Sequence, residues 1–312
     1  MERKYDVIID TDPGHDDALA IMLAARSGRF NIRAITTVAG NSTVENTTRN
    51  ARFILKLLGR EDIPVYSGAE KPLKRSLVQA VVHGESGLAG IDPKNEPQLT
   101  GNAAQKIIEI AGSNPGKITL IALGPLTNVA KAMLKNPEAM RKLKQVVIMG
   151  GAIRAPGNKN RVAEFNVFVD PEAADIVFRF PVKKTLVPLD ACNDVRMLLN
   201  DFKRIRDADL RKPILAMMKP FISGILKDEG VNAALMYDPL TVYALMNPDA
   251  CRKKGYDIRV ETKGEVTRGM TVAELRKGKA GEANVEVVEK ISAKAFKKDF
   301  VICLSYNGKY KT

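Results

Sequence analysis

Four aspartates within eight residues form the densest group of ionisable side chains in the sequence. They lie in 10-DTDPGHDD-17, directly after a strand-like apolar run. Like charges this close together are costly to bury unless a cation compensates them. All the donors are hard oxygens, which favours Ca²⁺ or Mg²⁺ over zinc. The segment predicts a divalent cation site in which the Pro13-Gly14 turn brings Asp16 and Asp17 toward Asp12. The alternative is that one or two of these aspartates only cap the next helix.

The residues around this cluster alternate between strand-like and helix-like patterns. A capping box of Ser42 and Glu45 is expected to open the second helix. The expected strands are 5–10, 32–40, 63–68, 117–123, 145–150 and 185–189, and the expected helices are 16–28, 42–59, 102–111, 126–135 and one that begins at Asp170-Pro171. This alternation predicts an α/β fold with a mostly parallel central sheet, flanked by helices in a Rossmann-like core. Ligands of such sheets bind at the carboxyl ends of the strands, where the aspartates lie.

The remainder of the chain extends the same core. Residues 197–250 are expected to be mainly helical, 256–290 to form extra short strands, and 292–304 to form a final helix. Since no linker or repeat interrupts the pattern, we expect a single domain over residues 1–312. The long irregular stretches 69–101 and 151–165 suit loops over a site.

Composition excludes several classes of function. The net charge of +13 comes from lysines and arginines scattered among acids, aromatic residues make up only 5% of the chain, and no nucleic-acid motif is present, so we expect no nucleic-acid partner. Near-apolar runs such as 18–25 are too short to cross a membrane, and the charged amino terminus is unlike a signal peptide. Three widely spaced cysteines, at 192, 251 and 303, indicate reduced thiols in the cytoplasm.

Several segments resemble the nucleoside hydrolases, the inosine-uridine preferring family. The N-terminal signature of that family is similar to 10-DTDPGHDDALAIMLA-24. Its further motifs follow in order as 38-VAGN-41, 83-HGESGL-88, 122-ALGPLTN-128, 148-IMGG-151, 164-EFNVFVDPEAA-174 and 238-DP-239. The resemblance covers residues 5–250. It implies Ca²⁺-dependent hydrolysis of the N-glycosidic bond of ribonucleosides to free base and ribose, a role in nucleoside salvage, and assembly as a homodimer or homotetramer.

The resemblance also implies roles for individual residues. The Ca²⁺ ligands would be Asp12, Asp17, Asp238 and the backbone carbonyl of Leu123, with Asp12 also the general base and Asp10 outside the ligand set. The ribose would contact Asp16, at its 2′-hydroxyl, together with Asn41, Asn158, Glu164 and Asn166. His83 matches a histidine near the nucleobase. The chemistry agrees, because a bound cation lowers the pKa of a water and a neighbouring carboxylate can take its proton.

One position departs from the family pattern. Well-studied members carry a histidine before the late aspartate, where this chain has Tyr237. The proton for the leaving base would then come from Tyr237, from His83 or from solvent, although a phenol with a pKa near 10 is a weak acid at neutral pH. Phe221 and Tyr237 are the aromatic surfaces expected near the base. His15, the other histidine, is expected to be a loop residue.

Two other functions stay open at this point. A strand followed by Asp-x-Asp also marks the haloacid-dehalogenase phosphatases, but Pro13-Gly14 replaces their Gly-Thr and their later acidic motif is not evident. The replacement of the family histidine by Tyr237 also allows a nucleoside- or ribose-binding protein that has lost turnover. Release of free ribose from a nucleoside separates these possibilities.

Overall fold

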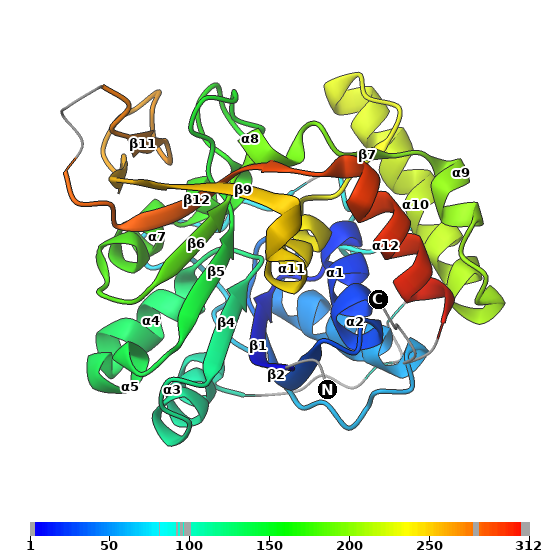
Figure 1. Ribbon diagram of the computed structural model, residues 1–312, viewed down its shortest axis with the longest axis horizontal. Helices are drawn as coiled ribbons and strands as arrows, with labels where there is room; N and C mark the ends of the chain where they lie inside the picture. The colour runs from blue at the N-terminus through cyan, green and yellow to red at the C-terminus, as the bar shows by residue number, and fades with distance from the viewer. Residues whose placement is uncertain are drawn as a thin grey trace.

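The computed structural model describes residues 4–80, 82–91, 93, 96, 101–276 and 281–306. Within these residues, the centre of the molecule is a sheet of eight strands in the order β3-β2-β1-β4-β5-β6-β12-β9 (Figure 1). Its strands are β1 (Tyr5–Thr11), β2 (Phe30–Thr37), β3 (Val65–Tyr66), β4 (Ile118–Ala122), β5 (Gln145–Met149), β6 (Lys184–Val187), β12 (Val285–Ile291) and β9 (Cys251–Tyr256). Neighbouring strands run parallel except β12 and β9. The predicted mostly parallel sheet is confirmed.

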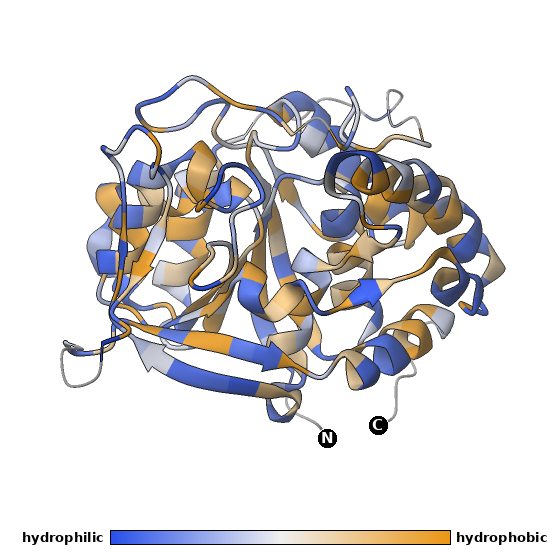
Figure 2. Cartoon of the chain, turned by 90° about the horizontal axis from the view of Figure 1, so that it is seen from above, coloured by the Kyte–Doolittle hydropathy of each residue, from blue (hydrophilic) through white to orange (hydrophobic). Residues whose placement is uncertain are grey.

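Helices cover both faces of the sheet. One face packs against α1 (His15–Arg26), α2 (Val44–Leu57), α10 (Ala208–Glu229), α11 (Tyr237–Met246) and α12 (Ala293–Ser305), and the other against α3 (Ala103–Ser113), α4 (Thr127–Lys135), α5 (Pro137–Arg141) and α7 (Pro171–Arg179). Along β1, Val7 and Ile9 enter the first core and Ile8 the second, because successive strand residues point to opposite faces. Figure 2 shows hydrophobic and hydrophilic residues together in helices around the sheet, as expected for helices with one buried side. Helices α1 and α11 differ, because they are buried along almost their whole length.

The chain changes direction across the sheet between β1 and β4. After β1 it adds β2 and β3 on one side, and it then returns to place β4, β5 and β6 on the other. In open parallel sheets this reversal leaves a crevice beyond the carboxyl ends of the two central strands. Asp12 directly follows β1 and Leu123 directly follows β4, so both residues lie at that crevice.

Shorter elements surround the sheet. Two small antiparallel sheets pair β10 with β11 and β7 with β8. Their bounds are Ile258–Val260, Thr271–Ala273, Arg196–Met197 and Ala234–Leu235, and the short helices are α6 (Phe165–Val169), α8 (Leu189–Cys192), α9 (Leu199–Lys203) and the 3₁₀ turn η1 (Pro248–Ala250). The expected helical character of 197–250 and the short strands that follow are both present. Expected strand 63–68 shortens to β3.

Two local predictions were wrong. The N-cap of α2 is Thr43, whose hydroxyl accepts the Asn46 N–H, and the predicted Ser42 cap instead bonds its hydroxyl to the carbonyl of Glu85. His15 is not a loop residue: it opens α1 and is fully buried. In both cases tertiary contacts of the 83–91 loop, which the local sequence does not reveal, determine the placement.

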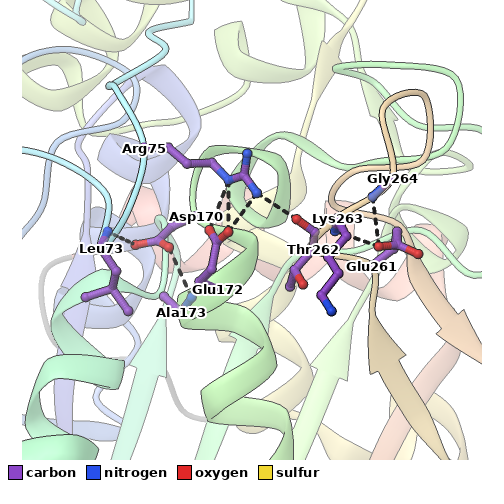
Figure 3. A network of polar contacts seen from close by, with 9 residues as sticks. All are labelled: Leu73, Arg75, Asp170, Glu172, Ala173, Glu261, Thr262, Lys263 and Gly264. Carbon is purple, nitrogen blue, oxygen red and sulfur yellow. Dashed lines mark hydrogen bonds and ion pairs between the residues drawn. The ribbon is translucent and has the colours of Figure 1, made fainter.

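A buried carboxylate, Asp170, ties the segment around Leu73 to helices α4 and α7 (Figure 3). One oxygen caps α7 by accepting the Ala173 N–H at 3.0 Å, and the other accepts the Leu73 N–H at 2.9 Å and the Thr127 hydroxyl at 2.7 Å. Nearby, Arg75 makes an ion pair with Glu172 at 2.7 Å and donates to the Thr262 carbonyl at 2.6 Å. This network fixes the segment that leads to Ala80 and His83.

Asp170→Ala should lower the free energy of unfolding by about 2–4 kcal/mol, because it removes a helix cap and leaves buried donors unpaired. Asp170→Asn keeps one acceptor oxygen and should cost less. Urea denaturation measures both, with the exposed Asp194→Ala as control. A change at Asp170 no larger than at Asp194 would contradict this role.

Candidate active site

A cavity of about 300 Å³ opens at the crevice beyond β1 and β4. Its walls combine acidic and amide side chains with apolar and aromatic ones. The lining residues are Asp16, Asn41, Ala80, Val82, His83, Leu123, Met149, Asn158, Lys159, Glu164, Phe165, Asn166, Phe221, Ile225, Asp228, Leu235, Tyr237 and Asp238. A concave site with convergent polar groups at this edge is the usual place for a small ligand.

Three buried carboxylates meet at one end of the cavity. Asp16 and Asp17 come from the first turn of α1 and Asp238 from the first turn of α11, and one oxygen of each lies within 4.8 Å of the others. Burial and the neighbouring carboxylates raise the pKa of Asp16 to about 8 and that of Asp238 well above its ordinary value. Ionising these groups together therefore needs a compensating positive charge.

Asp12 lies beside this trio, at the end of β1. Its Oδ2 accepts the Asn41 N–H at 2.7 Å, and it is not itself one of the three grouped carboxylates. Burial, and after it the charge of Asp17, raises the pKa of Asp12 well above its ordinary value. A Cβ on Gly40 or Gly124 would lie 2.1 or 2.5 Å from an Asp12 oxygen, so both glycines are needed to admit this carboxylate.

Hydrogen bonds hold Asp17 in a fixed orientation. Its Oδ1 accepts from the Thr11 hydroxyl, and its Oδ2 accepts the Gly14 N–H at 3.0 Å and the Asn41 side-chain amide at 3.0 Å. The same Asn41 amide donates to the Asp12 carbonyl at 3.1 Å. Asn41 therefore uses its side-chain nitrogen to join the acidic residues and offers only its carbonyl oxygen to the cavity.

Asp10 lies behind the cluster, inside the sheet. It accepts from the Thr36 hydroxyl at 2.5 Å and from the Asn128 amide at 2.9 Å. Burial raises its pKa to about 7, although both hydrogen bonds lower it. Asn128 also donates to the Thr37 carbonyl and accepts the Ala69 N–H, so it links β1, the end of β2 and the segment that follows β3.

The opposite wall is built around the N-terminus of α6. Glu164 is its N-cap, with oxygens that accept the N–H groups of Asn166 at 2.8 Å and Gly151 at 3.0 Å. Burial raises the pKa of this carboxyl. The Asn166 amide donates to the Leu123 carbonyl at 2.7 Å, and the exposed Asn158 accepts the Phe165 N–H at 2.9 Å. The wall thus presents amide and carboxylate oxygens beside the Leu123 carbonyl.

Three stacked rings lie at the cavity, where His83 and Phe221 line it and His15 is buried behind them. The rings of His15 and Phe221 lie 4.8 Å apart at 9°, and His83 stacks on both at 22°. The Nδ1 atoms of the two histidines are 3.0 Å apart, and His15 Nε2 lies 3.0 Å from the Ala89 carbonyl oxygen. Burial lowers the pKa of His15 to about 4 and that of His83 well below its ordinary value. Both imidazoles are therefore neutral at pH 7.

The acidic end fits a divalent cation. Every donor there is an oxygen, from Asp16, Asp17 and Asp238, with Asp12 and the Leu123 carbonyl nearby, and this hard set suits Ca²⁺ or Mg²⁺. The structure groups Asp16 with Asp17 and Asp238, although the sequence pattern assigned Asp16 to the sugar. The ligand and sugar roles of these residues stay predictions.

All the site residues expected from the sequence lie at or beside this cavity. Asp12 and Asp17 do not line it but contact Asn41, which does. Sequence reasoning missed the buried stack of His15, the support from Thr36 and Asn128, and Lys159 and Asp228 in the lining. Asn128 is the last residue of the motif 122-ALGPLTN-128, and this motif was the sequence signal that could have identified it. The spacing of Phe221, Ile225 and Asp228 along one side of α10 was another.

Comparison with known proteins agrees with this architecture. The model of the inosine-uridine preferring nucleoside hydrolase family matches residues 7–298. This chain belongs to the nucleoside hydrolase family. It is 41% identical over 299 residues to the pyrimidine-specific ribonucleoside hydrolase RihA of Shewanella woodyi, covering 93% of this chain and 95% of the relative, and 40% identical over 297 residues, with the same coverage, to RihA of Citrobacter koseri.

Solved structures of nucleoside hydrolases have the same fold. The plant enzyme PpNRh1 superposes with a TM-score of 0.90 at 30% identity, covering 96% of this chain and 99% of the other. A purine-preferring ribonucleoside hydrolase from Gardnerella vaginalis also gives 0.90, at 27% identity and 96% and 98% coverage. The nucleoside hydrolase chain described here is thus an N-glycosyl hydrolase, and the phosphatase alternative is set aside.

Two further sequence expectations concern membranes and thiols. None of the helices in the described part of the chain is long and apolar enough to span a membrane. The cysteines are free, with Cys192 and Cys303 buried, and burial raises the pKa of the Cys251 thiol to about 11. These thiols are therefore poor nucleophiles at neutral pH.

In protein stripped of cations by a chelator, the melting temperature should fall as the pH rises from about 7 to about 8, above the range in which the buried, neutral His15 and His83 have the opposite effect on stability. Asp10 and Asp16 have folded pKa values of about 7 and about 8, above their ordinary 3.8, so the folded state holds more protons than the unfolded state in this range. Stability is then lost with rising pH, by up to about 1.4 kcal/mol per pH unit for each such proton.

Millimolar calcium should remove most of this fall, because a bound cation stabilises the ionised carboxylates. Differential scanning calorimetry at several pH values, with and without the chelator, measures the effect. Asp16→Asn should reduce the change of melting temperature with pH in the presence of the chelator. A melting temperature that does not change with pH in the chelator would contradict the proposed repulsion.

Proposed function

We propose that this nucleoside hydrolase cleaves the N-glycosidic bond of ribonucleosides in a Ca²⁺-dependent reaction, with water as the nucleophile. The supporting observation is the buried group of Asp16, Asp17 and Asp238 at one end of a nucleoside-sized cavity, with Asp12 beside it. When bound there, the cation would supply a positive charge that makes a neighbouring water more acidic. Asp12, Asp17, Asp238 and the Leu123 carbonyl are the proposed ligands.

Asp12 is the proposed general base. Its carboxylate is held by the Asn41 N–H and lies against Gly40 and Gly124, which leave it little freedom to rotate. In its ionised form it accepts a proton from the attacking water as the water oxygen bonds to C1′. The raised proton affinity of a buried carboxylate favours this transfer, and a cation bound beside Asp12 would keep the group ionised beforehand.

The ribose is proposed to lie against the amide and carboxylate wall. Asp16 would accept from the 2′-hydroxyl, and the remaining contacts would come from Asn41, Asn158, Glu164 and Asn166. Glu164 and Asn166 are already fixed by bonds to Gly151 and Leu123, so they need little reordering when the sugar binds. Holding the sugar in this way also orients C1′ toward the acidic end.

The base is proposed to occupy the end formed by His83, Phe221 and Tyr237. His83 or Tyr237 would provide the proton that a neutral leaving base needs. Because His83 is neutral at pH 7, any proton that it donates must come from a ring N–H and not from an imidazolium. Pyrimidine ribonucleosides are the proposed substrates, by similarity to the two RihA relatives.

A non-catalytic binder with the same fold is the second candidate. The single feature that favours it is Tyr237 in place of the histidine of well-studied relatives. The intact acidic end favours turnover over binding alone. Cytoplasmic location, a role in nucleoside salvage and assembly as a dimer or tetramer remain predictions for the single domain.

Asp12→Asn should lower kcat for ribose release from uridine by at least about a hundredfold, because it removes the base and a proposed ligand. A reducing-sugar assay on purified protein in calcium measures this. The exposed Asp194→Asn should retain wild-type turnover. No ribose release by the wild-type enzyme would favour the binder, and an active Asp12→Asn would exclude Asp12 as base.

The enzyme should prefer uridine to 2′-deoxyuridine in kcat/KM by at least about a hundredfold. Without the 2′-hydroxyl, Asp16 and its surroundings keep buried polar groups unpaired. Release of uracil, followed by chromatography, gives both values. Similar kcat/KM values for the two substrates would contradict the sugar roles of Asp16 and Asn166.

A further inference from the structure

The proposed sugar wall includes a segment with no helix or strand of its own, residues 150–164 between β5 and α6. It carries Asn158, whose side-chain oxygen accepts the Phe165 N–H at 2.9 Å, so that its side-chain nitrogen can donate to a ligand in the cavity. Asn158 is exposed, and an exposed loop keeps one conformation only if other elements hold its backbone. The proposed sugar contact of Asn158 therefore depends on what holds this segment.

A single carboxylate outside the cavity holds the first half of the segment. Asp190 Oδ2 accepts the Ile153 N–H at 2.8 Å, and Asp190 Oδ1 accepts the N–H groups of Arg154 at 2.7 Å and Ala155 at 3.2 Å. Successive backbone N–H groups that converge in this way form a concave binding site for an anion, which Asp190 fills. Asp190 belongs to α8 and lines a neighbouring cavity, not the nucleoside-sized one.

A second element holds the residue just before these three. The hydroxyl of Thr271, in β11, donates to the Ala152 carbonyl at 2.6 Å and accepts the Ala152 N–H at 2.9 Å, and Thr271 is only 1% exposed. The backbone N–H groups of residues 151–155 thus all bond to side chains, those of Glu164, Thr271 and Asp190. Of these three side chains, Asp190 orders the part of the segment nearest to Asn158.

We propose, on the basis of the function proposed above, that Asp190 is a positioning residue for sugar binding, which places Asn158 where the ribose binds. Only Pro156 and Gly157 separate the residues held by Asp190 from Asn158. The proline ring fixes its own φ at about −65°. Gly157 lets the two halves of the segment approach closely, since a Cβ there would lie 2.3 Å from backbone atoms. The orientation set by Asp190 is therefore transmitted to Asn158.

A carboxylate suits this role better than a neutral side chain. Both of its oxygens accept from the segment, whereas an asparagine has one acceptor oxygen and would turn an NH₂ group toward a backbone donor. The arginines that line the neighbouring cavity with Asp190 bond to other groups, Arg154 to the Tyr256 hydroxyl at 3.1 Å and Arg252 to Glu289 at 3.1 Å. Replacing Asp190 thus acts mainly on the backbone of the segment.

The expected effect is on sugar affinity and not on the chemical step, because Asn41 holds Asp12 and Asp17 from a different segment. In Asp190→Asn, KM for uridine and the inhibition constant of free ribose should both rise by about tenfold, while kcat should change by less than about threefold. Asp190→Glu keeps both acceptor oxygens on a longer side chain and should raise the two constants less.

A double-mutant cycle tests whether Asp190 acts through Asn158. Asn158→Ala alone should raise KM and the inhibition constant of ribose, and adding Asp190→Asn should raise them by less than about twofold further. The matched control is Asp194→Asn, an exposed carboxylate just after α8, which should leave both constants and kcat at wild-type values. Melting temperatures verify that each variant folds, and Asp190→Glu replaces Asp190→Asn in the cycle if the latter does not.

Three results would contradict the inference while the proposed function stands. Uridine is hydrolysed but the Asp190 variants leave both constants unchanged, they lower kcat without changing the constants, or their effect is the same with and without Asn158. If the wild-type enzyme releases no ribose from uridine, the proposed function is wrong and the inference is wrong with it.

Discussion

Repulsion among carboxylates buried together at the carboxyl end of β1 is the main electrostatic constraint on this structure. Asp16, Asp17 and Asp238 approach within 4.8 Å, and Asp12 lies beside them. Two features of the fold reduce the cost. The N-terminal ends of α1 and α11, which carry partial positive charge, supply all three carboxylates, and backbone N–H groups of Gly14 and Asn41 donate to Asp17 and Asp12. The repulsion that these groups do not compensate is the electrostatic reason to expect a divalent cation.

The rest of the site follows from where the sheet brings its strand ends. β1 delivers Asp12, β2 leads to Gly40 and Asn41, and β4 ends at Leu123 and Gly124. Hydrogen bonds between these segments make the acidic end rigid before any ligand arrives, whereas the base end is built from α10, α11 and the loop containing His83. The proposed chemistry at the sugar therefore depends on the strand ends, whereas the proposed contacts with the base come from helices and a loop.

Sequence patterns could predict the sheet, its helices and the acidic cluster, because strand alternation and a dense run of aspartates are local signals. They could not predict that Thr43 caps α2 or that His15 is buried, because both depend on contacts with residues 83–91 that lie far away in the sequence. The motif 122-ALGPLTN-128 marked Asn128, but its partners Asp10, Thr37 and Ala69 could not be predicted, because they lie in other segments. The role of a residue whose partners lie in another element can be described only once the fold is known.

We propose that the acidic end holds one divalent cation that the reaction requires. The most direct measurement is the metal content of the purified enzyme, determined by mass spectrometry together with uridine hydrolysis before and after chelation. We expect one calcium per chain, loss of activity when the calcium is removed, and recovery of activity when it is restored. Stoichiometric zinc, or full activity in protein free of metal, would contradict it.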